Sequence, residues 1–91
     1  MSVQMTVDVN AATFLPDERA LTENAVVEIE ESDGFDVSIE SVGPDSMIRV
    51  RAQKYGKTSF VIKDGDAEYR YLLDVYEDDK GHSQISIIPE G

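Results

Sequence analysis

Apolar and polar residues alternate along most of this sequence, and this alternation constrains the fold more than any other feature. The longest run covers residues 67–76, in which every second residue on one face is apolar: Ala67, Tyr69, Tyr71, Leu73 and Val75. Successive side chains of a β-strand point to opposite faces of the sheet, so this pattern predicts a strand with one buried face. Apolar spacing typical of helices is nearly absent. The sequence therefore predicts an all-β protein.

About seven segments carry the alternating pattern, and turn residues separate them. They cover residues 3–9, 25–30, 35–39, 48–53, 58–63, 67–76 and 85–87. Asp-Gly pairs at 33–34 and 64–65 predict tight hairpin turns, because glycine adopts positive φ without steric cost. The first pair would join the second and third segments as a hairpin. Residues 10–24 lack the alternation and contain Pro16, so we expect a loop there, with one short helical turn at residues 18–21.

The number and spacing of these segments predict the fold class. Short strands separated by turns every 8–12 residues or so are typical of an antiparallel sandwich or a small barrel. A chain of 91 residues is long enough for one domain and too short for two. We expect residues 1–91 to form a single immunoglobulin-like antiparallel β-sandwich. A small barrel of the SH3-like or OB type is the alternative, because strand number alone does not separate it from two packed sheets.

The charge and the cysteine content exclude several classes of function. Eight Lys and Arg residues against 19 Asp and Glu residues give a net charge of −11 at pH 7. Such a field repels nucleic acid and anionic lipid, so we expect no direct binding to either. Cysteine is absent, which excludes disulfides, thiolate metal sites and a cysteine nucleophile.

The cellular location is predicted from what the sequence lacks. Residues 1–9 have neither the basic start nor the continuous apolar segment of a signal peptide. No stretch approaches the roughly 18 apolar residues that a membrane-spanning helix needs. We therefore expect synthesis in the cytoplasm, and residence in a virion if the gene is viral.

Residue types used in catalysis or metal binding occur here without the partners that such chemistry needs. His82 is the one histidine, and no motif places a serine nucleophile or a second metal ligand near it. The carboxylates of residues 64–68 and 77–79 do not have the spacing of an EF-hand, and polar turns account for both groups. Motifs for phosphate binding, zinc proteases and serine hydrolases are absent. We expect no enzyme activity, no metal and no cofactor.

Four residues are the predicted contacts with a protein partner. Tyrosine contributes a large contact area with one polar tip, and Tyr55 and Tyr76 lie in a turn or on the polar register of a strand. Glu28 and Glu30 form an acidic row on the outward face of another strand, together with the following Glu31. This row is either a contact surface or a guard against edge-to-edge aggregation, since charge on exposed strands blunts pairing.

The stretch from Val37 to Tyr76 resembles bacterial immunoglobulin-like domains of the group-2 type, which occur in bacterial surface proteins and in phage virion proteins. The resemblance rests on the strand Phe35–Ile39, the Ile48–Ala52 strand, the turn and strand Gly56-Lys57-Thr58-Ser59-Phe60-Val61-Ile62, and the closing Leu73-Asp74-Val75. It implies adhesion or structural display and brings no catalytic residues.

Together, these observations predict a non-enzymatic structural or binding module. We expect a phage virion protein, such as a capsid decoration or tail-associated protein, whose partner is a virion shell or surface protein. The alternative is an acidic mimic of nucleic acid that inhibits a host nuclease or another DNA-binding enzyme. A module of a larger bacterial surface protein is a third interpretation. Edge strands would also allow homo-oligomers.

Overall fold

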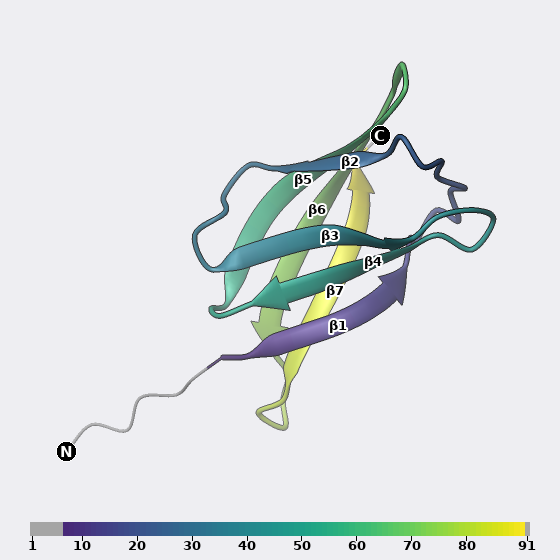
Figure 1. Ribbon diagram of the computed structural model, residues 1–91. Coiled ribbons are helices and arrows are strands. Elements are labelled where there is room, and N and C mark those ends of the chain that lie inside the picture. Colours follow the sequence, from purple (N-terminus) through teal and green to yellow (C-terminus); the bar gives the residue numbers. More distant parts are fainter. Residues whose placement is uncertain (1–6, 91) are drawn as a thin grey trace.

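The computed structural model describes residues 7–90, which contain seven β-strands and no helix (Figure 1). Accordingly, this part of the chain has no helix that is long and apolar enough to cross a membrane. The strands are β1 (Val9–Phe14), β2 (Val26–Ile29), β3 (Phe35–Ser41), β4 (Met47–Ala52), β5 (Gly56–Asp64), β6 (Ala67–Glu77) and β7 (Ser83–Glu90). Sheet I has the order β1-β4-β3 and sheet II the order β2-β5-β6-β7, with all pairings antiparallel. The predicted all-β sandwich of about seven strands is confirmed.

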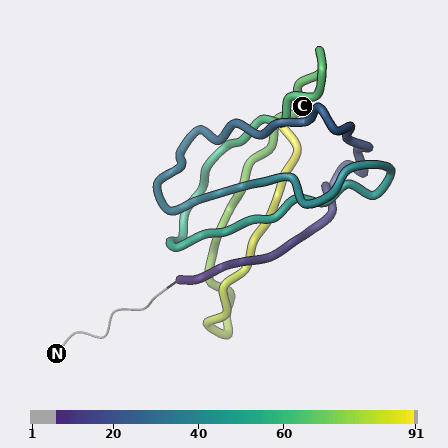
Figure 2. The backbone as a smooth tube through the Cα atoms, viewed as in Figure 1, coloured from purple at the N-terminus to yellow at the C-terminus, as the bar shows by residue number. Residues whose placement is uncertain are grey.

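The core lies between the two sheets, and β5, β6 and β7 of sheet II cross the strands of sheet I in the views of Figures 1 and 2. Every second residue of the central strands points into this layer, which explains the alternation in the sequence. The rings of Phe60 and Tyr71 stack there with their centroids 5.2 Å apart. The largest fully buried side chains are Tyr71, Phe60, Ile48, Ile62, Leu73, Val50 and Val75.

The order of the strands differs from that of a constant-type immunoglobulin domain. That domain places its first, second, fifth and fourth strands in one sheet and its third, sixth and seventh in the other. Here the first and fourth strands share sheet I with the third, and the second and fifth strands share sheet II with the sixth and seventh. The architecture is thus a seven-strand sandwich, counted over residues 7–90, with its own connectivity.

The prediction of a hairpin at Asp33-Gly34 was wrong. The chain does turn there, but β2 pairs with β5 and β3 pairs with β4, so the turn carries the chain from one sheet to the other. The Thr58 hydroxyl holds this corner, because it accepts from the Glu31 amide at 3.0 Å and donates to the Glu31 carbonyl at 3.3 Å. The second predicted hairpin is confirmed, with Gly65 and Asp66 as the two turn residues, because Asp64 ends β5 and pairs with Ala67.

The prediction for the start of the chain also needs correction. The expected strand at residues 3–9 falls mostly outside the described residues, and β1 runs from Val9 to Phe14 through the beginning of the expected loop. The middle of β1 reads Asn-Ala-Ala-Thr, in which apolar and polar residues do not alternate. Backbone pairing with β4 holds this segment in the sheet. Residues 18–21 form no helical turn; Leu21 forms an isolated β-bridge with Gly43.

The four edge strands differ in how they discourage pairing with other chains. β2 carries Glu28 and is followed by two more glutamates, and β3 has a shift of register between Ile39 and Ser41. Charges and bulges of this kind protect an edge. By contrast, β1 has no charged residue and β7 has only Glu90 near its end. Within residues 7–90, charges or a bulge therefore protect the edges formed by β2 and β3, whereas the edges formed by β1 and β7 lack this protection.

Candidate protein-interaction site

The loop after β1 begins with a tight turn at residues 15–18. The Glu18 amide donates to the Leu15 carbonyl at 3.1 Å, and Pro16 occupies the second position, where its fixed φ favours a turn. Glu18 itself has a φ of +55°, the left-handed region that a residue with a side chain rarely adopts. Such strain persists only where surrounding contacts enforce it.

Those contacts centre on the Asp17 carboxylate. The buried Tyr71 hydroxyl donates to it, 3.0 Å from Oδ1 and 3.1 Å from Oδ2, and the Arg19 Nε donates to Oδ2 at 2.7 Å. The Arg19 guanidinium also lies 4.0 Å from the centre of the Tyr69 ring, a cation–π contact. Burial, followed by the hydrogen bond to Asp17, raises the pKa of Tyr71. The loop is thus tied to the middle of β6.

Ser46 fixes the same loop to the turn between β3 and β4. Its side chain is buried; its Oγ accepts from the Leu21 amide at 2.8 Å and donates to the Gly43 carbonyl at 2.6 Å. The Gly43 amide in turn donates to the Leu21 carbonyl at 2.9 Å. The buried Ser46 hydroxyl therefore both accepts and donates a hydrogen bond, as expected for a buried polar group.

A groove lies between these two loops, and we call it the Phe14 groove. It encloses about 460 Å³ and is lined by Phe14, Leu15, Pro16, Glu18, Arg19, Pro44, Asp45 and Ser46. A second hollow of about 240 Å³ lies between β1 and β7 and is lined by Thr13, Phe14, Pro16, Ile85 and Ile87. Phe14 borders both hollows and is 61% exposed. An aromatic side chain so exposed beside two concave surfaces is a candidate anchor for a protein partner.

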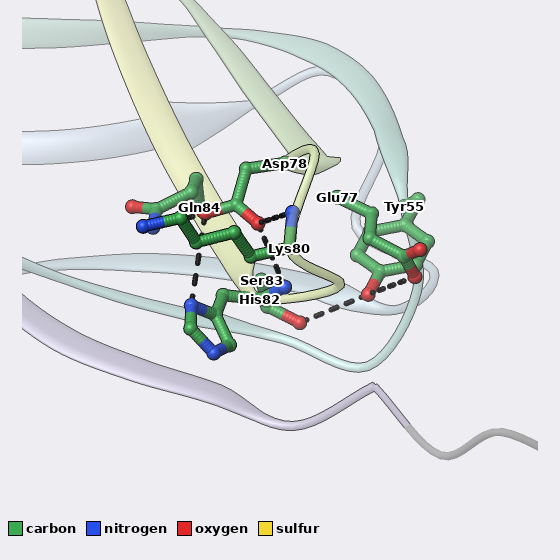
Figure 3. A network of polar contacts seen from close by, with 7 residues as sticks. All are labelled: Tyr55, Glu77, Asp78, Lys80, His82, Ser83 and Gln84. Atoms are coloured by element: carbon green, nitrogen blue, oxygen red, sulfur yellow. Dashed lines mark hydrogen bonds and ion pairs between the residues drawn. The ribbon is translucent and has the colours of Figure 1, made fainter.

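The turn between β6 and β7 carries a second polar network, shown in Figure 3. The Asp78 Oδ1 accepts from the Lys80 and His82 amides, both at 2.9 Å, and its Oδ2 accepts from the Gln84 side chain at 3.0 Å. The hydrogen bond from the His82 amide, and after it the bond from the Gln84 side chain, lower the pKa of Asp78. His82 lies 3.9 Å from the same carboxylate. The network organises an exposed turn.

The two tyrosines predicted as contacts lie at this end of the molecule. The Tyr55 hydroxyl donates to Glu77 at 3.2 Å and lies 3.0 Å from the Ser83 Oγ (Figure 3). Tyr76 is the neighbour of Glu77 in β6, pairs with Gln84 and is 41% exposed. The structure therefore brings Tyr55 and Tyr76 to one end of sheet II.

The two predicted glutamates lie apart from these tyrosines, on β2 and just after it. Both are exposed, and Glu28 forms an ion pair with Lys63 at 3.0 Å, an interaction that raises the pKa of Lys63. Arg70 lies 3.8 Å from Glu68 on the same face. Cations therefore interrupt the acidic row on this face of sheet II.

Sequence reasoning missed Phe14 as a candidate contact. It lies in the stretch expected to be a loop, where no alternation distinguished it, and its neighbours in the groove come from a segment about 30 residues away. The combination of a large aromatic residue with Pro16 two positions later was the available signal. Within residues 7–90, no cluster of His, Asp and Glu could hold a metal ion.

Comparison with known proteins identified no match among family models, curated proteins or solved structures.

Proposed function

We propose that this protein is a non-enzymatic binding module that holds a protein partner at the Phe14 groove. The observation that carries this proposal is Phe14 itself, 61% exposed at the border of two hollows. Binding covers such a side chain and removes its apolar surface from water, at about 25 cal/mol per Å². Anchors of this kind contribute much of the affinity of protein interfaces.

The surroundings of Phe14 favour binding because they are already fixed. Asp17 ties one wall of the groove to Tyr71, and Ser46 ties the two loops together. A surface that is ordered before binding loses less conformational entropy when the partner arrives. Glu18 and Asp45 add carboxylates to the lining, so the partner that fits best presents an apolar side chain flanked by basic residues.

We further propose that the partner is a repeated protein of a larger shell, as in a virion decorated on its capsid or tail. Support comes from the resemblance of residues 37–76 to domains found in virion and surface proteins. A small module on a repeated lattice gains avidity from many weak contacts, so a single shallow groove is sufficient.

Affinity capture with matched baits tests the proposal. The baits are the tagged wild-type protein, Phe14→Ser and Tyr76→Ser, each incubated at low and at high salt with an extract of the source cells, infected if the gene is viral. We expect a coat, tail or surface protein that the wild type and Tyr76→Ser retain at high salt and that Phe14→Ser loses. Retention by Phe14→Ser and loss by Tyr76→Ser would move the site to the β6–β7 end and contradict the proposed groove.

The acidic mimic of nucleic acid is the competing hypothesis, and the net charge of −11 favours it. The pairing of Glu28 with Lys63 weighs against a continuous row of phosphate-like charges on sheet II. The same experiment separates the two hypotheses. Capture of a nuclease or another DNA-binding enzyme that is lost as salt rises would support the mimic, because ionic contacts are screened and apolar anchors are not.

A further inference from the structure

We propose that two copies of this chain pair through β7, so that sheet II of one copy continues into sheet II of the other. This proposal goes beyond the partner-binding function proposed above, and its interface meets the Phe14 site only at the hollow between β1 and β7. The starting observation is that β7 is an edge strand of eight residues with one charge, Glu90, whereas the β2 and β3 edges carry charges or a bulge. An edge of this length with a single charge at its end is a template for another strand.

Hydrogen bonds across sheet II determine which backbone groups of β7 face outward. The Glu30 amide donates to the Ser59 carbonyl at 2.9 Å, so Ser59 in β5 points its backbone groups toward β2. The backbone groups of successive residues point alternately to the two neighbouring strands. The amide and carbonyl of Phe60 therefore point toward β6, where Phe60 pairs with Tyr71. The amide and carbonyl of Tyr71 therefore point toward β5 and away from β7, in which Pro89 lies opposite Tyr71. The nitrogen of Pro89, which has no hydrogen to donate, therefore faces outward from the sheet. An edge strand tolerates proline in this position.

The same alternation exposes the amides and carbonyls of Ser83, Ile85 and Ile87, which share the register of Pro89. Among residues 7–90, no strand pairs with this side of β7. Unsatisfied groups in a row at strand spacing are what a second antiparallel strand would bind.

A second copy of β7 fits this row in a symmetric register. With a two-fold axis beside Ser86, Ile85 lies opposite Ile87 of the second copy, and Ser83 lies opposite Pro89 of the second copy. Ile85 and Ile87 exchange amide–carbonyl bonds with their counterparts, and the Ser83 amide donates to the opposite Pro89 carbonyl. Each outward amide of β7 then has an acceptor, and the strands overlap over nearly their whole length.

The side chains are compatible with this register on both faces. Ile85 and Ile87 of the added strand lie on the inner face, beside the hollow of about 240 Å³ that Thr13, Phe14 and Pro16 help to line. On the outer face Ser86 meets its own copy, and Gln84 meets Ile88, which is 48% exposed in the single chain. No two like charges oppose each other across these pairs, although each copy carries −11 overall.

A charge swap at the two-fold axis tests the interface. We expect sedimentation velocity of the wild-type protein to give a dimer in the micromolar to millimolar range. Ser86→Lys and Ser86→Glu each place two like charges face to face, so each variant alone should raise the Kd at least about tenfold. An equimolar mixture of the two should form a heterodimer, because lysine then faces glutamate. Ser38→Lys on the guarded edge strand β3 is the matched control and should remain dimeric.

Each outcome decides the matter. A wild-type monomer over this range, or a dimer that neither Ser86 variant weakens, would overturn the proposal, and so would a mixture that stays monomeric. Ser86 pairs with Asp74 in β6, so a lysine at position 86 can form an ion pair with Asp74 of its own chain. Circular dichroism with a thermal melt checks that both Ser86 variants fold. Capture of a partner by the monomeric variants would show that the Phe14 groove works without the dimer, so the two proposals can fail separately.

Discussion

Two aspartates at opposite ends of the molecule gather hydrogen bonds in the same way and serve the fold differently. Asp17 accepts from Tyr71, 54 residues along the chain, and its partner is buried in the core. Asp78 accepts from groups two to six residues away, in a turn exposed to solvent. One carboxylate therefore joins distant parts of the fold, and the other shapes a local turn.

This difference indicates where a hydrogen bond contributes to stability. A bond in contact with water is exchanged for a bond to water at little net cost, whereas a buried group that loses its partner bears the whole cost of desolvation. The loop end, which contains Asp17 and Ser46, should therefore be sensitive to substitution. The β6–β7 turn around Asp78 should be tolerant. Three substitutions test this contrast, in order of expected effect.

Ser46→Ala should have the largest effect. The change removes an acceptor from the buried Leu21 amide and a donor to the Gly43 carbonyl. We expect the free energy of unfolding to fall by about 2 kcal/mol, and the Tm by roughly 8–16 °C. Thermal and chemical denaturation measure both. A shift in Tm no larger than that of an exposed serine such as Ser38→Ala would contradict the assigned role of this bond.

Tyr71→Phe should have an intermediate effect. It keeps the ring in the core and removes the hydroxyl that donates to Asp17, so we expect a loss of about 1–1.5 kcal/mol. Tyr69→Phe is the matched control on the same face of β6, because its contact with Arg19 is made by the ring. Equal stability losses in the two variants, measured by denaturant titration, would mean that Asp17 does not anchor the loop.

Asp78→Asn should have the smallest effect, and its effect should depend on pH. Hydrogen bonds in the folded state lower the pKa of Asp78, so its contribution is present above the usual carboxyl pKa of about 4 and disappears as the pH falls through the folded value. The variant should therefore be slightly less stable than the wild type at pH 7 and nearly equal to it in strong acid. Thermal melts across this range give the comparison. Asp79→Asn, in the same turn, is the matched control and should be as stable as the wild type at pH 7, because the hydrogen bonds of this turn go to Asp78.

Local patterns in the sequence predicted most of the strands. The faces of β6 follow the alternation, because the core takes Tyr71, Leu73 and Val75 from one side of that strand. The turn between β5 and β6 followed from Asp64-Gly65, with Gly65 at a φ of +62°. Each of these features depends on neighbours in sequence, so a short window of residues contains the necessary information.

Features that depend on distant partners were not predicted. The turn at Asp33-Gly34 resembles a hairpin locally, but the pairing of β2 with β5 is decided by where the two sheets meet. The sequence of β1 does not alternate, and its backbone pairing with the distant β4 holds it as a strand. The Phe14 groove requires loops that come together only in the folded chain, through Ser46 and Leu21. In each case the missing information is a contact between residues far apart in sequence.

The order of strands within the sheets also sets the order in which the chain can assemble during synthesis. β3 with β4, and β5 with β6 and β7, follow one another along the chain and can pair as soon as they emerge. β1 emerges first, yet its first residue pairs with Ala52, and Val26 in β2 pairs with Lys63. The chain must therefore be made as far as β4 before β1 is paired, and as far as β5 before β2 is paired. A nascent chain stopped before β4 would expose β1, a strand without a single charge, to whatever other strand it meets first.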